Sequence, residues 1–143
     1  MIRCTRRLEF DAGHRVTLHE SKCRNVHGHR YRVEITCEAP ELDDAGRVVD
    51  FGAVKGHMGP WLDDHLDHGY LFREGDPVGQ WLGEQGHKVY QMPVDLGEPT
   101  AENIARLVGR VARQKLNGDG LRVVHVRVYE TPNCWADWEP SDA

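Results

Sequence analysis

The stretch HGHRYRVEITC, residues 27–37, places histidine, tyrosine, valine, isoleucine and cysteine at its odd-numbered positions, with mostly polar residues between them. This period of two is typical of a β-strand with one buried face. The stretch IRCTRRLEFDAGH, residues 2–14, has the same period, with mostly apolar side chains at its even-numbered positions. We predict that the two strands pair like a hairpin, with the intervening loop at one end.

The rest of the chain predicts two long helices and further strands around this pair. Asp50 is suited to cap a helix over residues 51–66, and Thr100 a second helix over residues 100–116. Shorter elements are expected at 48–49 (strand), 78–85 (helix), 88–92 (strand), 121–131 (strand) and 135–138 (strand). This order indicates an α+β fold in which two long helices pack on one face of an antiparallel sheet.

Length and composition fit a single domain over residues 1–143. The chain is 39% hydrophobic and 29% charged, which is typical of globular proteins. No apolar run approaches the roughly 18 residues of a membrane span. The N-terminal segment has no apolar signal region, so we expect a cytoplasmic protein. In that compartment Cys4, Cys23, Cys37 and Cys134 are expected to be thiols and not a disulfide framework.

Basic side chains are concentrated in one segment of an otherwise acidic chain. The formal net charge of the protein is −5, yet residues 14–32 carry five arginine or lysine side chains against one acid, Glu20. This distribution argues against general nucleic-acid binding and for a local anionic ligand. The alternative is a solvated, charged strand face.

Three histidines are expected to converge where the two strands meet the loop. His14 ends the apolar face of the first strand, and His27 and His29 begin that of the second. Three neutral imidazoles with an open fourth position form a catalytic zinc site, whereas structural zinc sites usually close with four protein ligands. We therefore predict a Zn²⁺ site on these histidines. For any one of them alone, a hydrogen-bonded core histidine is the alternative.

Cys23 lies in the loop that is expected to cover this site. It could be a fourth ligand that closes the site, a reactive thiolate favoured by the metal and by Lys22 and Arg24, or an ordinary loop thiol.

Two acidic residues, Asp67 and Glu130, are further candidates for the active site. Asp67 precedes His68 at the end of the first helix, and a carboxylate beside an imidazole suits a general acid or base. Glu130 follows three valines on a face that is expected to be buried, so its carboxylate needs a partner. That partner is either a ligand with paired N–H donors or an internal arginine.

Six motifs occur in the order found in one known family. They are FDAGHR at residues 10–15, CRNVHGH at 23–29, VVDF at 48–51, LDH at 66–68, PTAEN at 99–103 and YET at 129–131. The set spans nearly the whole chain and resembles the 6-pyruvoyl-tetrahydropterin synthase and 6-carboxytetrahydropterin synthase family. The resemblance implies the tunnelling fold, in which sheets of several subunits join into a barrel. It also implies a homohexamer of two trimers with active sites between subunits.

The resemblance also implies roles for individual residues. These are zinc ligation by His14, His27 and His29, catalysis by the Cys23 thiolate with Asp67 and His68 as acid–base relay, and pterin binding by Glu130 and Thr100. For the triphosphate of the substrate we expect Arg15, Lys22 and Arg24, from charge and position alone.

The spacing of three residues between Cys23 and His27 resembles the bacterial carboxy enzymes of queuosine-type deazapurine synthesis. Animal pyruvoyl enzymes typically have a longer spacing. The implied reaction converts dihydroneopterin triphosphate to 6-carboxytetrahydropterin, acetaldehyde and triphosphate, without a nicotinamide cofactor. The alternatives are 6-pyruvoyl-tetrahydropterin synthase, which eliminates triphosphate without cleaving the side chain, another zinc hydratase or hydrolase, and a non-catalytic zinc- or purine-binding module.

The chain departs from the family pattern in two places. Residues 73–98 form a longer segment than in compact bacterial members, and Phe72 stands where asparagine is frequent. Both are expected near the rim of the active site, so they bear on substrate detail more than on zinc chemistry.

Overall fold

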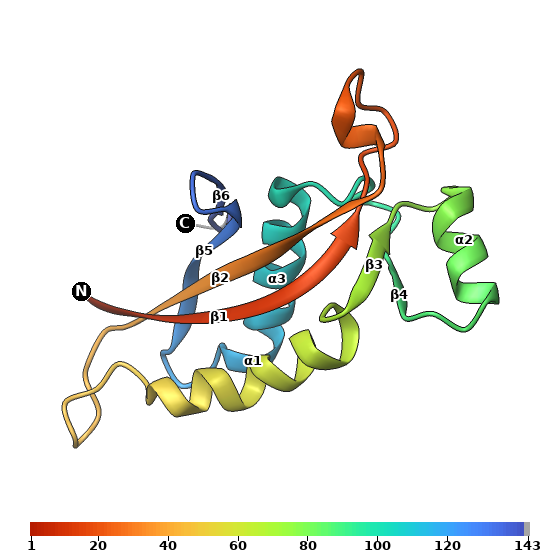
Figure 1. Cartoon of the computed structure of the whole chain (residues 1–143). Helices are drawn as coiled ribbons and strands as arrows, with labels where there is room; N and C mark the ends of the chain where they lie inside the picture. Colours follow the sequence, from red (N-terminus) through yellow and green to blue (C-terminus); the bar gives the residue numbers. More distant parts are fainter. Residues whose placement is uncertain (142–143) are drawn as a thin grey trace.

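The computed structural model of the chain describes residues 1–141. A six-stranded sheet with the order β4-β3-β1-β2-β5-β6 runs through it (Figure 1). The antiparallel part consists of β1 (Ile2–His14), β2 (His27–Ala39), β5 (Arg122–Thr131) and β6 (Cys134–Trp138). The short strands β3 (Gly69–Phe72) and β4 (Val89–Gln91) add in parallel beside the C-terminal end of β1.

Two long helices cover one face of this sheet. Helix α1 (Phe51–His65) packs against β1, and α3 (Ala101–Leu116) packs against β5 and β6. The predicted caps are present, since the Asp50 carboxylate accepts from the Gly52 N–H and the Thr100 hydroxyl from the Asn103 N–H. The short α2 (Pro77–Glu84) lies beside β3 and β4 at the edge of the molecule (Figure 1).

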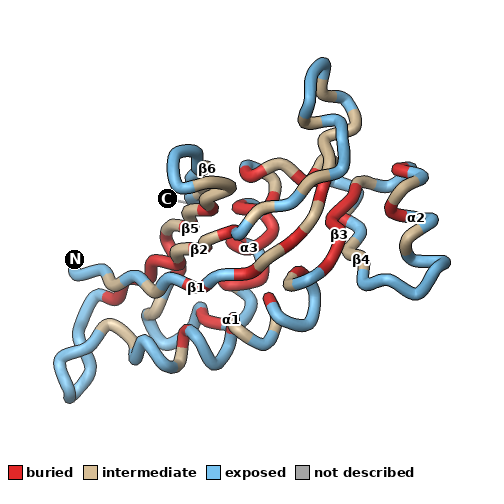
Figure 2. Tube along the Cα trace, in the orientation of Figure 1, coloured by how far each residue is buried: buried red, intermediate tan, exposed pale blue. Residues whose placement is uncertain are grey.

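The core lies between the sheet and the two helices. Phe10 and Tyr31 are opposite each other in the β1–β2 register, and their rings stack with centroids 4.9 Å apart. The buried residues of β1 begin at Leu8 and those of β2 at Tyr31, whereas Figure 2 shows the loops at the ends of this pair largely exposed. From the helices, the core receives Val54, Met58, Leu62, Ile104 and Val108.

The opposite face of the β1–β2 pair is charged. Glu9 binds Arg30 at 2.7 Å and Arg32 at 3.0 Å, and Asp11 binds Arg30 at 2.9 Å. The two arginines at the C-terminal end of the basic segment therefore belong to a solvated strand face, which was one of the two alternatives for this segment.

The predicted α+β fold is confirmed, and three details differ from the prediction. Val48 and Val49 lie in bends and not in a strand, because their side chains pack against the core without a neighbouring strand to pair with. Strand β3 was not predicted, because all four of its residues are buried and the stretch has no alternation. With β3 and β4 the sheet is mixed and not purely antiparallel.

None of the helices in residues 1–141 is long and apolar enough to cross a membrane.

Candidate metal centre and active site

Three histidines meet at the loop end of the β1–β2 pair, as predicted. His14 lies directly opposite His27 in the register, and His29 lies opposite Ala12, so the imidazoles are direct and diagonal neighbours on one sheet face. Their ring centroids are 4.7, 4.9 and 5.1 Å apart. One nitrogen from each ring lies within 4.8 Å of the others, which makes this a group that could hold a metal ion.

The hydrogen bonds of these histidines leave nitrogens available for a metal. The Nδ1 atoms of His14 and His27 each lie 2.7 Å from a backbone carbonyl oxygen, that of Pro99 and of Asn25 respectively. A proton donated from Nδ1 leaves Nε2 as the basic nitrogen. Within residues 1–141, Nε2 of His14 and Nε2 of His29 are buried without a hydrogen-bond partner. Unpartnered, oriented imidazole nitrogens fit the ligands of a zinc ion.

The electrostatics of the site favour neutral imidazoles. Burial lowers the pKa of His14 and of His29, and this effect outweighs the opposing attraction of the Glu130 carboxylate. Neutral histidine is the form that binds metals. We therefore interpret the contacts between these rings and Glu130 as approaches to neutral histidines and not as formed salt bridges.

Glu130 lies on β5 beside this cluster. Its Oε1 is 3.4 Å from His29 Nε2, and its Oε2 is 4.0 Å from His14 Nε2. These neutral histidines are its close neighbours, and within residues 1–141 no ion pair joins Glu130 to an arginine, which was the alternative partner for this carboxylate. Glu130 is therefore placed where it can meet a ligand bound at the metal centre.

Asp67 and His68 form a hydrogen-bonded pair between α1 and β3. The Asp67 Oδ2 atom lies 2.7 Å from His68 Nδ1, and Oδ1 accepts from the Asp11 N–H at 2.9 Å. Burial opposes ionisation of Asp67, but these two partners outweigh it and hold the pKa of the carboxyl below its usual range. His68 has a left-handed backbone (φ 60°), and its side chain is 77% exposed. Its imidazole borders an open hollow of about 440 Å³ that His27 and His29 also line.

Cys23 lies in a 3₁₀ turn (Lys22–Arg24) within the loop of residues 15–26, which we call the thiol loop. Figure 1 shows this loop projecting beyond the ends of β1 and β2. The residues whose ligand atoms lie close enough together to hold a metal are the three histidines, and Cys23 is not among them. The described geometry therefore favours a site with three protein ligands. The thiol is free and half-buried.

A sequence model of the 6-pyruvoyl tetrahydropterin synthase family matches residues 3–141. The chain belongs to this family. It is 42% identical over 140 residues to a 6-carboxy-5,6,7,8-tetrahydropterin synthase from Rickettsia bellii, covering 96% of this chain and 99% of that relative. A protein of the same name from Rickettsia felis is 41% identical with the same coverage. The family resemblance of the sequence motifs is thus confirmed.

Solved structures show the same fold. An uncharacterized protein from Wolinella succinogenes matches with a TM-score of 0.84 and 22% identity over 98% of each chain. The Caenorhabditis elegans 6-pyruvoyl tetrahydropterin synthase matches with a TM-score of 0.71 and 20% identity, over 98% of this chain and 96% of that one. At this identity the likeness concerns the fold of the family alone.

The basic residues that we expected to bind triphosphate separate into two kinds. Lys22 and Arg24 are exposed on the thiol loop. Arg15 instead places Nη2 2.8 Å and Nε 3.2 Å from Oδ1 of the fully buried Asp76 carboxylate. This ion pair occupies one edge of the Arg15 guanidinium. The distribution of charge along the sequence did not show that Arg15 has such a partner.

Sequence reasoning assigned Tyr31 to the core and missed its polar end. Its ring centroid lies 5.9 Å from that of His14 and 5.6 Å from that of His29. Its hydroxyl is buried and has no hydrogen-bond partner within residues 1–141. Burial raises the pKa of Tyr31, so the hydroxyl remains a donor at neutral pH. Its position two residues after His29 on the same strand face was the available signal.

Replacing His27 or His29 with alanine is expected to remove most of the bound zinc, because two imidazoles cannot complete the three-ligand site. Zinc per chain is measured by elemental analysis after dialysis against limiting zinc. His57→Ala is the matched control, since His57 is exposed on α1 away from the cluster. Undiminished zinc in both cluster variants would contradict the site.

Proposed function

We propose that this chain is a zinc-dependent 6-carboxytetrahydropterin synthase. The reaction converts dihydroneopterin triphosphate and one water to 6-carboxytetrahydropterin, acetaldehyde and triphosphate. The observation that carries the proposal is a cluster of three histidines that does not include Cys23, in a chain aligned with 99% of the length of relatives named for this activity. A metal with an open position beside a separate thiol suits proton transfer on a hydroxylated side chain.

His14, His27 and His29 are the proposed zinc ligands. When bound, zinc would polarise oxygen atoms of the substrate side chain and make the neighbouring C–H bonds more acidic. The protein contributes neutral imidazoles, two of which are oriented by the backbone carbonyls of Pro99 and Asn25.

Cys23, Asp67 and His68 are the proposed proton-transfer groups. The Cys23 thiolate would move a proton at the side-chain carbon, and His68 would exchange protons on the opposite side of the substrate. The 2.7 Å contact with Asp67 favours a proton on Nδ1 of His68, which leaves Nε2 to accept or donate. The ring is reduced as the side chain is oxidised, so the proposal requires no nicotinamide.

Glu130 and Thr100 are the proposed pterin-binding residues. The Glu130 carboxylate would accept hydrogen bonds from the ring N–H and amino group of the pterin. Thr100 uses its oxygen as an acceptor for the Asn103 N–H, and its hydroxyl proton remains available to a ligand. Lys22 and Arg24 are proposed for the triphosphate. Arg15 is proposed only through the N–H groups on the other edge of its guanidinium, because the Asp76 carboxylate balances its charge.

We also propose a homohexamer built from two trimers. Within residues 1–141, β1 pairs with β3 only through residues 12–14, and β4 and β6 are the outer strands of the sheet. The edge of β1 over residues 2–11 and the outer edges of β4 and β6 therefore lack a partner strand in this part of the chain. Unpaired edges are suited to pairing with another subunit.

The four cysteines are free thiols, which supports the expected cytoplasmic location.

The pure, zinc-loaded enzyme is expected to release 6-carboxytetrahydropterin and acetaldehyde in equal amounts from dihydroneopterin triphosphate. The short spacing between Cys23 and His27 is expected to hold the thiolate at the angle that favours side-chain cleavage. Anaerobic incubation, aldehyde trapping and mass analysis of the pterins measure both products. Abundant 6-pyruvoyl-tetrahydropterin without matching acetaldehyde would contradict the carboxy reaction and leave family membership intact.

Cys23→Ala is expected to keep its zinc and to lose turnover by about 10²–10⁴-fold, the usual contribution of a proton-transfer group. Cys134→Ala, which removes an exposed thiol on β6, is the matched control and is expected to retain full activity. Loss of zinc together with activity in the Cys23 variant would show that Cys23 is a metal ligand.

Glu130→Gln is expected to weaken pterin binding by about 5- to 150-fold, which corresponds to roughly 1–3 kcal/mol for a mismatched buried hydrogen bond. Glutamine replaces one acceptor oxygen with a donor that would face the donors of the ligand. Calorimetric titration with a non-reactive pterin measures the affinity, and Glu84→Gln on the exposed face of α2 serves as control. Unchanged affinity would remove Glu130 from the pterin site.

A further inference from the structure

The thiol loop has little hydrophobic anchorage. Figure 2 shows it largely exposed, and none of its residues belongs to the core cluster. Its own backbone bonds shape it, with the Val16 N–H donating to the Cys23 carbonyl at 2.9 Å and the Asn25 N–H to the Lys22 carbonyl at 3.0 Å. These bonds fold the loop upon itself and join Cys23 to Val16, so the position of Cys23 relative to His14 depends on how the segment that follows β1 is held.

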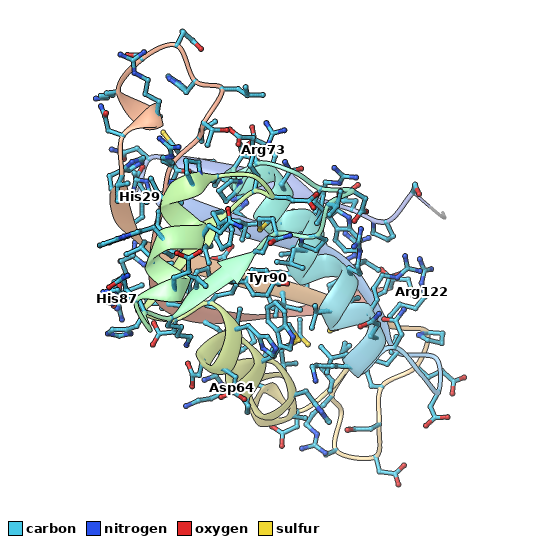
Figure 3. The ribbon with its side chains drawn as sticks, turned by 90° about the vertical axis from the view of Figure 1, so that its right-hand side faces the viewer. His29, Asp64, Arg73, His87, Tyr90 and Arg122 are labelled. Carbon is cyan, nitrogen blue, oxygen red and sulfur yellow. The ribbon has the colours of Figure 1, made fainter. Side chains whose placement is uncertain are left out.

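Glu98, at the end of the long segment 73–98, connects the loop to the body of the protein. Its Oε1 accepts from the Thr17 hydroxyl at 2.6 Å, and its Oε2 accepts from the Leu18 N–H at 3.1 Å. The Arg73 guanidinium approaches Oε1 at 3.8 Å, and the Glu98 side chain is only 13% exposed. Figure 3 shows Arg73 and His29 at the end of the molecule from which the loop projects, with Asp64 at the opposite end.

The turn that carries Glu98 also orients a proposed zinc ligand. The carbonyl of the next residue, Pro99, is the oxygen 2.7 Å from His14 Nδ1. The Glu98 carbonyl accepts from the Asn103 side chain at 3.0 Å, and Thr100 caps α3, so the first turn of this helix immobilises the segment. One rigid turn therefore contacts both the thiol loop and His14.

A second carboxylate of the same segment ties down the start of the loop. Asp76 is buried and binds Arg15, and it also accepts from the Tyr70 hydroxyl at 2.9 Å and the Val78 N–H at 3.0 Å. Arg15 is thus held at the end of β1, and Glu98 holds the two residues that follow Val16. The chain is fixed up to Leu18 before it turns toward Cys23.

We propose that Glu98 is a positioning residue that holds the thiol loop, and with it Cys23, at a set place relative to His14. The inference rests on the proposed function for the role of Cys23. It also assigns a role to the long segment 73–98, which departs from the family pattern. This segment supplies Asp76 and Glu98, the two carboxylates that anchor the loop. Glu98 acts through the loop, because its carboxylate contacts Thr17, Leu18 and Arg73 and is not part of the histidine group that could hold a metal.

Limited proteolysis with trypsin can measure how firmly the thiol loop is attached, because trypsin cleaves after Lys22 and Arg24 in this loop. Cleavage of a folded loop requires it to open locally, so its rate follows the stability of the loop attachment. In Glu98→Ala we expect nicking at these two bonds to be at least tenfold faster, because a single hydrogen bond to a charged group already changes an equilibrium by about tenfold and Glu98 makes two. Asp95→Asn is the matched control, since Asp95 lies on the same segment and pairs with Arg110 at 2.6 Å without contacting the loop.

Turnover separates positioning from general stability. In Glu98→Ala, kcat is expected to fall about tenfold or more while KM changes little, because misplacing a catalytic group costs rate more than binding. Zinc content and melting temperature are expected to match Asp95→Asn. Thr17→Val, which removes the hydroxyl from the loop side, is expected to reproduce the effect in part and to add little to Glu98→Ala in the double variant.

The outcomes are distinguishable from those of the proposed function. Equal nicking rates in wild type, Glu98→Ala and Asp95→Asn would overturn the anchoring role whatever the enzyme catalyses. Faster nicking with unchanged kcat would overturn the positioning role. If the wild type does not turn over dihydroneopterin triphosphate, the proposed function fails, while the nicking comparison still decides whether Glu98 holds the loop.

Discussion

The antiparallel register of β1 and β2 is the constraint on which the site depends. It places His14 opposite His27 and His29 one diagonal step away. A slip of one residue would turn every side chain of one strand to the other face and bring Gly28 opposite His14. The stacked Phe10 and Tyr31 lie in the core on the same faces, so burial of the core holds the register that brings the imidazoles together.

Burial then sets the chemistry of the histidines. The same low-polarity surroundings that hold the register lower the pKa of His14 and His29 and keep the rings neutral. Backbone carbonyls from the thiol loop and from the turn before α3 take the Nδ1 side of two rings. The site therefore requires polar partners from two segments outside the strands, and one of these segments, at Pro99, also carries the carboxylate that holds the loop.

Much of this arrangement could be predicted from local patterns. The period of two identified the faces of β1 and β2, and with them the three histidines, and the cap residues Asp50 and Thr100 marked the two long helices. Strand β3 could not be found in the same way, because it is buried on both faces and shows no alternation. Arg15 was assigned to an anion by charge alone, whereas its partner Asp76 lies 61 residues away in sequence.

The sequence by itself determined which strand faces are buried, which histidines share a face, and the family, since each of these depends on residues close in sequence or in a fixed motif order. Only the tertiary structure decided what these groups meet: the Pro99 carbonyl at His14, Glu130 beside His29, and Glu98 under the thiol loop. Periodicity encodes burial because burial is a property of one face of one element. The pairing of polar groups depends on packing between segments up to 85 residues apart. A local sequence pattern therefore cannot predict which polar groups pair.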